Sequence, residues 1–201
     1  MKRADGRELH LYDTLTRQVQ PVRASNGKRV RIYCCGPTVY RDAHIGNLRT
    51  FLLSDLVVRT LKFGGFDVDL VQNITDVGHM NEDFEEDKII AQSKSEKRDP
   101  YAIARGYEDG FHRDCAALLI TKARLYPRAS ESIELMVELI SRLFDLGFAY
   151  QGSDGSVYFD ATKSEQYGAI SGNRLDSLKP GHRFEFTEAG AKHFHADRKS
   201  T

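Results

Sequence analysis

The chain has 201 residues, its 29 Lys and Arg balance 29 Asp and Glu, and 40% of its side chains are apolar. This length suits one domain of ordinary size, or one with a small second domain, and allows a substantial buried core. No apolar stretch approaches the ~20 residues that span a bilayer, and zero net charge excludes a globally basic nucleic-acid binder, though not a local basic patch.

The start of the chain and its cysteines indicate the compartment. Residues 1–8 contain no apolar segment of the kind that secretory signals require. Three cysteines, of which Cys34 and Cys35 are adjacent, cannot form a disulfide framework. We therefore expect reduced thiols, a cytoplasmic location and no membrane partner.

Residues 30–75 predict a βαβ unit. A run with strand preferences covers 30–35, Gly36-Pro37-Thr38 interrupts it, and the apolar period from His44 onward is that of a helix ending at Gly64-Gly65. A second strand is expected over 66–74, so the pattern predicts a parallel sheet with a right-handed crossover. The apolar residues expected on the inward face of the helix are Ile45, Leu48, Leu52, Leu56 and Leu61.

The rest of the chain predicts two further helices and a hairpin. The acidic run at 82–87 lacks the residue order of a calcium loop and is interpreted as a solvated face. Asp99-Pro100 predicts a helix start, with Ile103, Tyr107, Phe111, Cys115, Leu118 and Leu119 inward, which makes Cys115 a core residue rather than a nucleophile. A second helix is expected over 130–146, with Ile133, Met136, Ile140, Leu143 and Phe144 inward. Residues 148–159 predict a β-hairpin around Asp154-Gly155, and 126–172 are expected to form a separate unit beside the sheet.

The connection between the first strand and its helix is the candidate site. In open α/β sheets ligands bind where a strand ends and a helix begins, and the unpaired N–H groups of the helix suit a phosphate. Gly46 allows a ligand to approach the backbone, and His44 can donate a hydrogen bond to phosphate oxygens. A plain strand-to-helix connection with a capping histidine explains the same residues, and both interpretations stay open at this point.

The run Cys35-Gly36-Pro37-Thr38-Val39-Tyr40, followed by His44-Ile45-Gly46-Asn47, closely resembles the signature of cysteinyl-tRNA synthetases. These are class I aminoacyl-tRNA synthetases, and His44–Asn47 is similar to the HIGH motif of that class. Further stretches resemble the same family in order, namely 11–17, 72–77, 155–160 and 167–172, so the resemblance covers nearly the whole chain.

The resemblance implies an α/β fold in which 1–125 form the first, HIGH-motif half of a Rossmann-like parallel sheet. Residues 126–201 would then form an inserted α+β connective segment with a partly irregular tail. It also implies a cysteine–tRNA ligase, which uses ATP to convert cysteine into cysteinyl-adenylate and transfers it to cysteine tRNA.

Site residues follow from the same resemblance, position by position. Cys35 matches the first zinc ligand of the family, whose metal holds the substrate thiolate. Gly36, Thr38 and Tyr40 match the amino-acid pocket. His44 and Asn47 match catalytic contacts to the ATP phosphates, and Pro37, Ile45 and Gly46 complete the ATP-binding set.

Several family features have no match in these 201 residues: the later zinc ligands, the lysine-rich KMSKS loop and the anticodon-binding domain. Residues 93–97 resemble a lysine loop only superficially, and His79, His193 and His195 are poor substitutes as ligands. Basic residues near the end could meet the acceptor arm of tRNA or simply be solvated: Arg174, Lys179, Arg183, Lys192, Arg198 and Lys199. These absences predict little or no activity of the 201 residues alone. Two alternatives are a truncated paralogue that binds nucleotide, cysteine or a protein without ligase activity, and an enzyme that couples cysteine to an amine instead of to tRNA.

Overall fold

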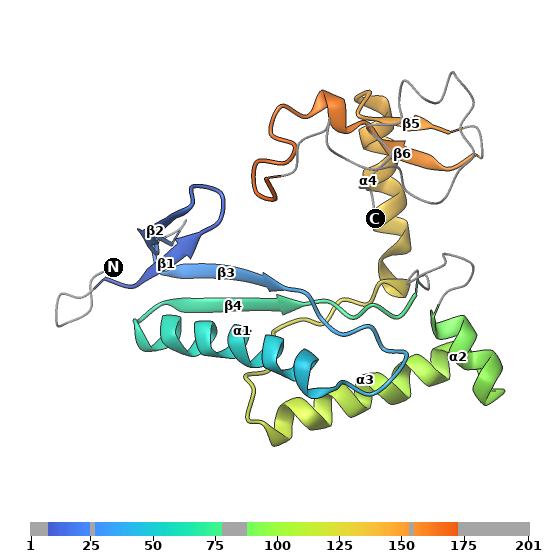
Figure 1. Cartoon of the computed structure of the whole chain (residues 1–201), viewed down its shortest axis with the longest axis horizontal. Coiled ribbons are helices and arrows are strands. Elements are labelled where there is room, and N and C mark those ends of the chain that lie inside the picture. The colour runs from blue at the N-terminus through green and yellow to red at the C-terminus, as the bar shows by residue number, and fades with distance from the viewer. Residues whose placement is uncertain (1–7, 25–26, 78–87, 153–154, 173–201) are drawn as a thin grey trace. The chain divides into compact units, whose positions relative to one another are not determined.

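The computed structural model describes residues 8–24, 27–77, 88–152 and 155–172. The chain divides into two compact units, one formed by Met1–Tyr12 and Val19–Ser132 and the other by Asp13–Gln18 and Ile133–Thr201. Figure 1 labels the helices and strands of both units.

The first unit is organised around a βαβ arrangement. β3 (Arg29–Cys34) and β4 (Asp67–Gln72) run parallel, in a register that pairs Arg29 with Asp67 and Cys34 with Gln72. Between them the chain forms α1 (Ile45–Phe63), which runs back alongside β4 (Figure 1). Gly64 caps its C-terminal end, and Gly65 follows in the left-handed region with φ +85°. The predicted strands, helix and glycine stop are confirmed.

A third segment lies beside the other edge of β4. The Gln72 N–H donates to the Leu125 carbonyl (3.1 Å), and the Ile74 N–H donates to the Pro127 carbonyl (2.9 Å). The pairing is parallel, but it consists of isolated bridges rather than a continuous strand. Among the described residues, the parallel sheet itself is therefore the β3–β4 pair.

The buried face of α1 differs in part from the predicted one: Leu61 is buried and Leu48 packs against the core as predicted. Phe51, Asp55, Val58 and Leu61 are buried, whereas Ile45 and Leu56 are 86% and 61% exposed. Asp55 belongs to the inner face because its carboxylate accepts hydrogen bonds from the Thr121 N–H (2.8 Å) and from Arg59 Nε (2.6 Å). Burial raises the pKa of Asp55, but these hydrogen bonds outweigh it and hold the pKa below its usual value. A satisfied carboxylate thus occupies a position that the apolar pattern assigns to solvent.

The longer of the two helices that follow β4 in the first unit is α3 (Pro100–Ala117). It starts as predicted, since the Asp99 carboxylate accepts a hydrogen bond from the Ala102 N–H (2.8 Å). Its inward residues Ile103, Phe111 and Cys115 are buried, as predicted. Leu118 and Leu119 are 41% and 76% exposed instead, because the helix ends at Ala117 and Leu119 takes a left-handed φ of 57°.

One helix and one β-hairpin are not predicted from the sequence. α2 (Lys88–Glu96) contains few apolar residues, and among them Ile89 is buried in the core. β1 (His10–Asp13) and β2 (Gln18–Pro21) form a hairpin. Its turn is stabilised by the Asp13 carboxylate, which accepts from the Leu15 N–H (3.1 Å), while Arg17 supplies the positive φ that glycine or asparagine usually provides.

The second unit contains α4 (Ile133–Asp145), which follows a short helical turn η1 (Ser130–Ser132), and an antiparallel hairpin of β5 (Ala149–Gln151) and β6 (Val157–Phe159). A further turn, η2 (Ala161–Lys163), ends the regular structure described. The predicted helix and hairpin are confirmed. The predicted inward residues Ile133, Met136, Ile140 and Phe144 are 41–48% exposed, so within the described residues α4 has no buried face.

Across the described part of the chain, no helix combines the length and the apolar character that crossing a bilayer requires.

Candidate functional site

The candidate site begins where β3 ends, at a close crossing of two backbones. The Gly36 N–H donates to Asn73 Oδ1 (2.9 Å), and the Tyr33 hydroxyl donates to the same oxygen (3.0 Å). A Cβ on Gly36 would lie 1.6 Å from the Asn73 carbonyl oxygen, so only glycine fits here. The position is fixed by the backbone of the segment after β4.

The next residues of the loop, 37–39, are held by the same segment. The Val39 N–H donates to the Thr75 carbonyl (3.1 Å), and the Thr75 N–H donates to the Pro37 carbonyl (3.0 Å). Val39 is 1% exposed and packs in the core with Phe51 and Phe111. This parallel bridge extends the β3–β4 pairing into the loop and places Thr38 beside Thr75.

His44 and Asn47 form a reciprocal cap at the start of α1. His44 Nδ1 accepts a hydrogen bond from the Gly46 N–H (3.0 Å), while the His44 N–H donates to Asn47 Oδ1 (3.2 Å). Because Nδ1 accepts, a neutral His44 carries its proton on Nε2, which leaves that N–H available to a ligand. His44 therefore caps the helix, as one of the two interpretations of the sequence held, and the cap also orients its Nε2–H donor.

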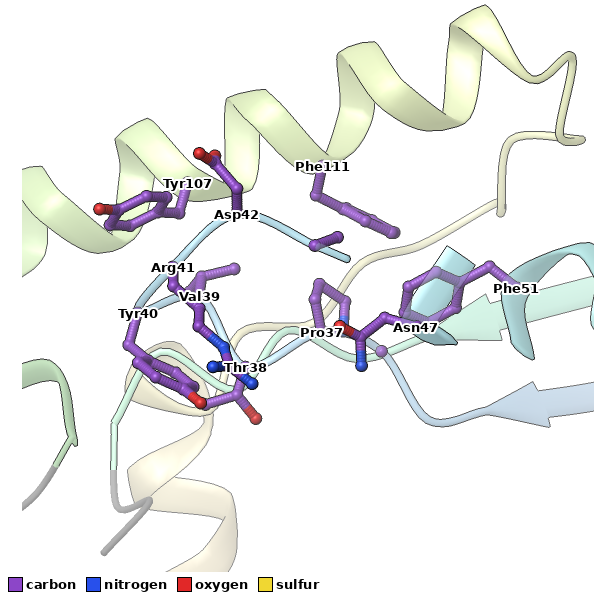
Figure 2. A pocket seen from close by; sticks show the side chains of 12 residues that line it. Pro37, Thr38, Val39, Tyr40, Arg41, Asp42, Asn47, Phe51, Tyr107 and Phe111 are labelled. Carbon is purple, nitrogen blue, oxygen red and sulfur yellow. The ribbon is translucent and has the colours of Figure 1, made fainter. Parts of the chain in front are cut away.

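The loop, α1 and α3 line a cavity of about 230 Å³ (Figure 2). Its walls come from residues 36–43 of the loop, Asn47 and Phe51 of α1, and Tyr107 and Phe111 of α3. Among the predicted site residues, those that line it are Gly36, Pro37, Thr38, Tyr40 and Asn47. Those that do not are Cys35, His44, Ile45 and Gly46, which lie at or near the two ends of the loop. Ile45 is 86% exposed.

The far wall of the cavity was not predicted from the sequence. Phe51 and Phe111 meet edge to face with ring centroids 5.1 Å apart. The Tyr107 hydroxyl donates to Glu96 Oε1 (3.1 Å), which also accepts from Gln92 Nε2 (2.7 Å) and so links α2 to the cavity wall. Burial and the Glu96 carboxylate both raise the pKa of Tyr107. The helical period assigns Tyr107 and Phe111 to the core, and no sequence signal connects them to the loop.

The adjacent cysteines lie on opposite sides of the chain. Cys34 is half-buried and packs against the core cluster of Val58, Leu70 and Ala123, whereas Cys35 is exposed. Zinc held by protein side chains needs three or four of them close together. Within the described residues, no group of three or more His, Cys, Asp or Glu is arranged to hold a metal ion, so these residues do not by themselves fit zinc. His79, His193 and His195 lie outside the described residues.

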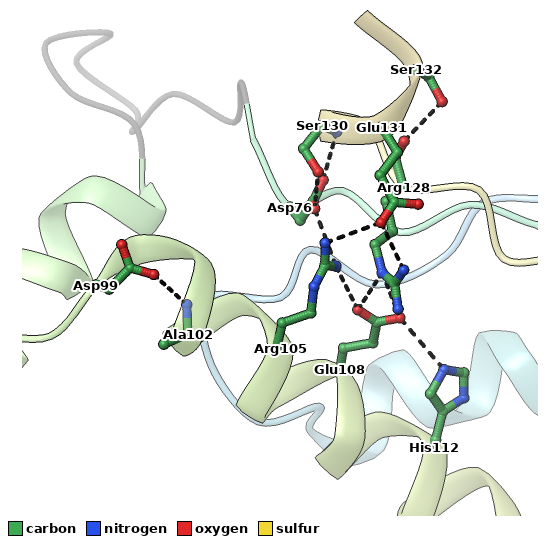
Figure 3. Close-up of polar contacts among 10 residues, drawn as sticks. All are labelled: Asp76, Asp99, Ala102, Arg105, Glu108, His112, Arg128, Ser130, Glu131 and Ser132. Carbon is green, nitrogen blue, oxygen red and sulfur yellow. Dashed lines mark hydrogen bonds and ion pairs between the residues drawn. The ribbon is translucent and has the colours of Figure 1, made fainter.

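A charged cluster lies where the segment after β4 meets α3 (Figure 3). Asp76, 1% exposed, accepts from the Ser130 N–H (2.9 Å) and pairs with Arg105 (3.4 Å). Glu108, 3% exposed, pairs with Arg105 Nη1 (3.0 Å) and Arg128 Nε (2.9 Å). Burial raises the pKa of Glu108, but the two guanidinium groups outweigh it and hold the pKa below its usual value.

Both arginines of this cluster also reach Glu131. Arg128 Nη1 lies 2.9 Å and Arg105 Nη2 lies 3.3 Å from its Oε1. Three carboxylates therefore share two cations, so the cluster has no spare positive charge for an anionic ligand. The cluster links α3 to the segment at 128–131 and stabilises the fold.

The remaining sequence candidates do not join the site. Cys115 is buried, and burial raises the pKa of its thiol to about 11, as expected of a core residue rather than a nucleophile. Residues 93–96 belong to the end of α2 and do not form a loop. The acidic run at 82–87 lies outside the described residues, as do Arg174, Lys179, Arg183, Lys192, Arg198 and Lys199.

The sequence over 21–197 matches the model of the tRNA synthetases class I (C) catalytic domain. The chain belongs to this family. It is 40% identical over 177 residues to the cysteine–tRNA ligase of Pyrococcus horikoshii and 41% identical over 182 residues to that of Thermus thermophilus. It is also 38% identical over 180 residues to the cysteine–tRNA ligase of Clostridioides difficile.

The matches cover most of this chain but a smaller part of each relative. They take in 88% of the chain for the Pyrococcus protein and 90% for the Thermus and Clostridioides proteins. The corresponding shares of the relatives are 35%, 38% and 37%. The chain thus spans little more than a third of these members of the class I (C) family. The predicted resemblance to cysteinyl-tRNA synthetases is confirmed.

Proposed function

We propose that this chain carries the amino-terminal catalytic portion of a cysteine–tRNA ligase. The reaction is attack of the cysteine carboxylate on the α-phosphate of ATP, which gives cysteinyl-adenylate and pyrophosphate, followed by transfer to the terminal ribose of cysteine tRNA. The observation that carries the proposal is the capped start of α1, where His44 and Asn47 stand at the end of a loop that lines a cavity. The substrate is inferred from the relatives, which are cysteine–tRNA ligases, and from the family, which is one of tRNA synthetases.

The proposed residue roles follow from the contacts of the loop. His44 Nε2 donates to a phosphate oxygen, since its Nδ1 is occupied by the Gly46 N–H. Asn47 Oδ1 is likewise occupied by the His44 N–H, so the Asn47 amide offers its Nδ2 hydrogens. Pro37, Ile45 and Gly46 complete the ATP-binding loop, and Gly36, Thr38 and Tyr40 contact cysteine. Catalysis of this kind rests on positioning and on stabilising the charge at phosphorus.

The fold and the remaining partners form the wider part of the proposal. Residues 1–125 are assigned to the first half of a Rossmann-like domain, and 126–201 to a connective insertion. Two features support this: the parallel β3–β4 pair and the third segment, which is bridged in parallel to the end of β4 and the residues after it. The boundary between compact units after Ser132 supports a separate insertion. Cysteine tRNA and a cytoplasmic location come with the ligase function. Cys35 is assigned to the family's zinc ligand by position only.

Replacement of His44 by asparagine tests the proposal. Asparagine is a strong N-cap, so His44→Asn keeps α1 capped while it removes the imidazole donor. We expect unchanged unfolding by urea and an ATP dissociation constant raised roughly tenfold, measured by calorimetry on the 201-residue chain. The matched control is His10→Ala on β1, which should leave ATP binding unchanged. Equal ATP affinity in wild type and His44→Asn would contradict the role given to His44.

A further inference from the structure

Arg41 lies on the cavity wall, and among the described residues its charge has no carboxylate partner. Its guanidinium carbon lies 5.1 Å from the centroid of the Tyr40 ring, a cation–π contact that restricts the orientation of the planar group. Figure 2 shows the side chain reaching past Tyr40 toward Thr38. Within the described residues, no carboxylate forms an ion pair with Arg41. Among the described residues that line the cavity, it is also the one Lys or Arg.

The neighbouring carboxylate points elsewhere. In Figure 2 the Asp42 side chain is directed toward α3 and Tyr107, on the other side of the loop from the Arg41 guanidinium. A Cβ on Gly110 of α3 would lie 3.4 Å from Asp42 Oδ1, so the absence of a side chain at Gly110 makes room for this orientation. The two adjacent charges are therefore separated, and Asp42 does not neutralise Arg41.

We propose that Arg41 is a nucleotide-binding residue that contacts the phosphates of ATP. This inference rests on the proposed function and adds a cation to the same site. The loop that carries Arg41 leads directly to the first turn of α1, where His44 and Asn47 present their donors. A guanidinium placed before such a turn adds charge-assisted hydrogen bonds to an anion. Triphosphate is favoured over the amino acid because ATP carries several negative charges, whereas a zwitterionic amino acid has no net charge.

The experiment compares nucleotides of different charge on matched variants of the 201-residue chain. Dissociation constants for ATP, AMP, adenosine and cysteine are measured by calorimetry for wild type, Arg41→Gln, Arg41→Lys and Arg31→Gln. Arg31 lies on the exposed side of β3 and does not line the cavity, so its substitution removes the same charge elsewhere. Urea unfolding of each variant checks that the fold is retained.

We expect Arg41→Gln to raise the dissociation constant for ATP about tenfold, to affect AMP less and to leave adenosine unchanged. Arg41→Lys keeps the charge but loses the planar stacking, so its dissociation constant for ATP should lie between those of wild type and Arg41→Gln. Arg31→Gln should bind ATP as wild type does. Weaker cysteine binding with unchanged ATP binding in Arg41→Gln would overturn the proposal, as would equal losses for ATP and adenosine.

Two further results separate this inference from the proposed function. If wild type binds ATP, His44→Asn weakens binding and Arg41→Gln does not, the inference fails while the proposed function stands. If wild type binds no ATP, both fail.

Discussion

The backbone carbonyl of Asn73 occupies the space into which a side chain on Gly36 would project. An ideal Cβ on Gly36 lies 1.6 Å from that oxygen and 2.8 Å from the Asn73 carbonyl carbon. Both obstructing atoms are backbone, so they cannot turn away as a flexible side chain would. The hydrogen bond from the Gly36 N–H to Asn73 Oδ1 depends on this approach.

Gly36→Ala should therefore destabilise the first unit and distort the loop. Relief of the clash requires the loop and the segment after β4 to separate, so we expect a loss of about 3 kcal/mol or more in the free energy of unfolding. Urea denaturation followed by circular dichroism measures it. Gly106→Ala is the matched control, because nothing lies within 4 Å of a Cβ there and alanine favours the helix by about 0.5–1 kcal/mol. A Gly36→Ala variant as stable as wild type would show that the crossing is looser than described.

The two apolar sides of α1 should differ sharply in their contribution to stability. Val58 is fully buried, whereas Leu56, two residues earlier, is 61% exposed. Val58→Ala should cost about 1–3 kcal/mol in the free energy of unfolding, since it leaves a cavity in the core, and Leu56→Ala should cost less than about 0.5 kcal/mol. If Leu56→Ala proves the more damaging change, the face predicted from the sequence pattern is the buried one after all.

The comparison of α1 with the other elements shows what local pattern can predict. His44 and Gly64-Gly65 mark the ends of α1, and Asp99-Pro100 marks the start of α3, because caps act within a few residues of the chain. The inward face of α1 is set instead by Asp55, whose partner Thr121 lies 66 residues away in sequence. No local pattern contains that contact.

The same distinction applies to the candidate site. The loop from Gly36 to Asn47 is visible in the sequence because glycine, proline and histidine interrupt a strand just before a helix. The opposite wall, Tyr107 and Phe111, belongs to α3 and reaches the loop through tertiary packing. Arg41 and Asp42 look equivalent as adjacent exposed charges, and their different directions in Figure 2 become clear only in three dimensions.

The Glu108 cluster predicts a loss of stability in acid. The pKa of Glu108 is lower in the folded chain than its usual value near 4.5. The contribution of Glu108 to the free energy of unfolding is therefore fully present above its usual pKa. This contribution is lost as pH falls through the pKa of the folded chain, because the unfolded chain then binds more protons. Thermal unfolding from pH 7 down to pH 3 should show this decline. Asp55, whose pKa is also lowered, contributes in the same direction.

Glu108→Gln isolates the share of the acid dependence of stability that comes from Glu108. It leaves Arg105 and Arg128 without their shared buried partner, so the variant should lose about 3 kcal/mol at pH 7. Its stability should then vary less with pH below 4.5 than that of wild type. Glu134→Gln, an exposed change on α4, is the control and should leave the pH profile unaltered. Identical pH profiles for wild type and Glu108→Gln would mean that another group carries the acid dependence.

The last prediction concerns activity of the 201 residues by themselves. We expect detectable ATP binding but little or no cysteine-dependent exchange of pyrophosphate into ATP. Cys35 is the one residue matched to a zinc ligand of the family, and the described residues contain no group of three ligands that would hold the metal and select the substrate thiolate. Arg41 is the single Lys or Arg on the described cavity wall, so the charge that develops on the triphosphate lacks further cations, a deficit that typically costs several kcal/mol. The measurement is exchange of labelled pyrophosphate with and without cysteine, with serine as the control amino acid. Robust exchange by the 201-residue chain, abolished by both Cys35→Ala and His44→Ala, would show that these 201 residues suffice for activation and would overturn the prediction.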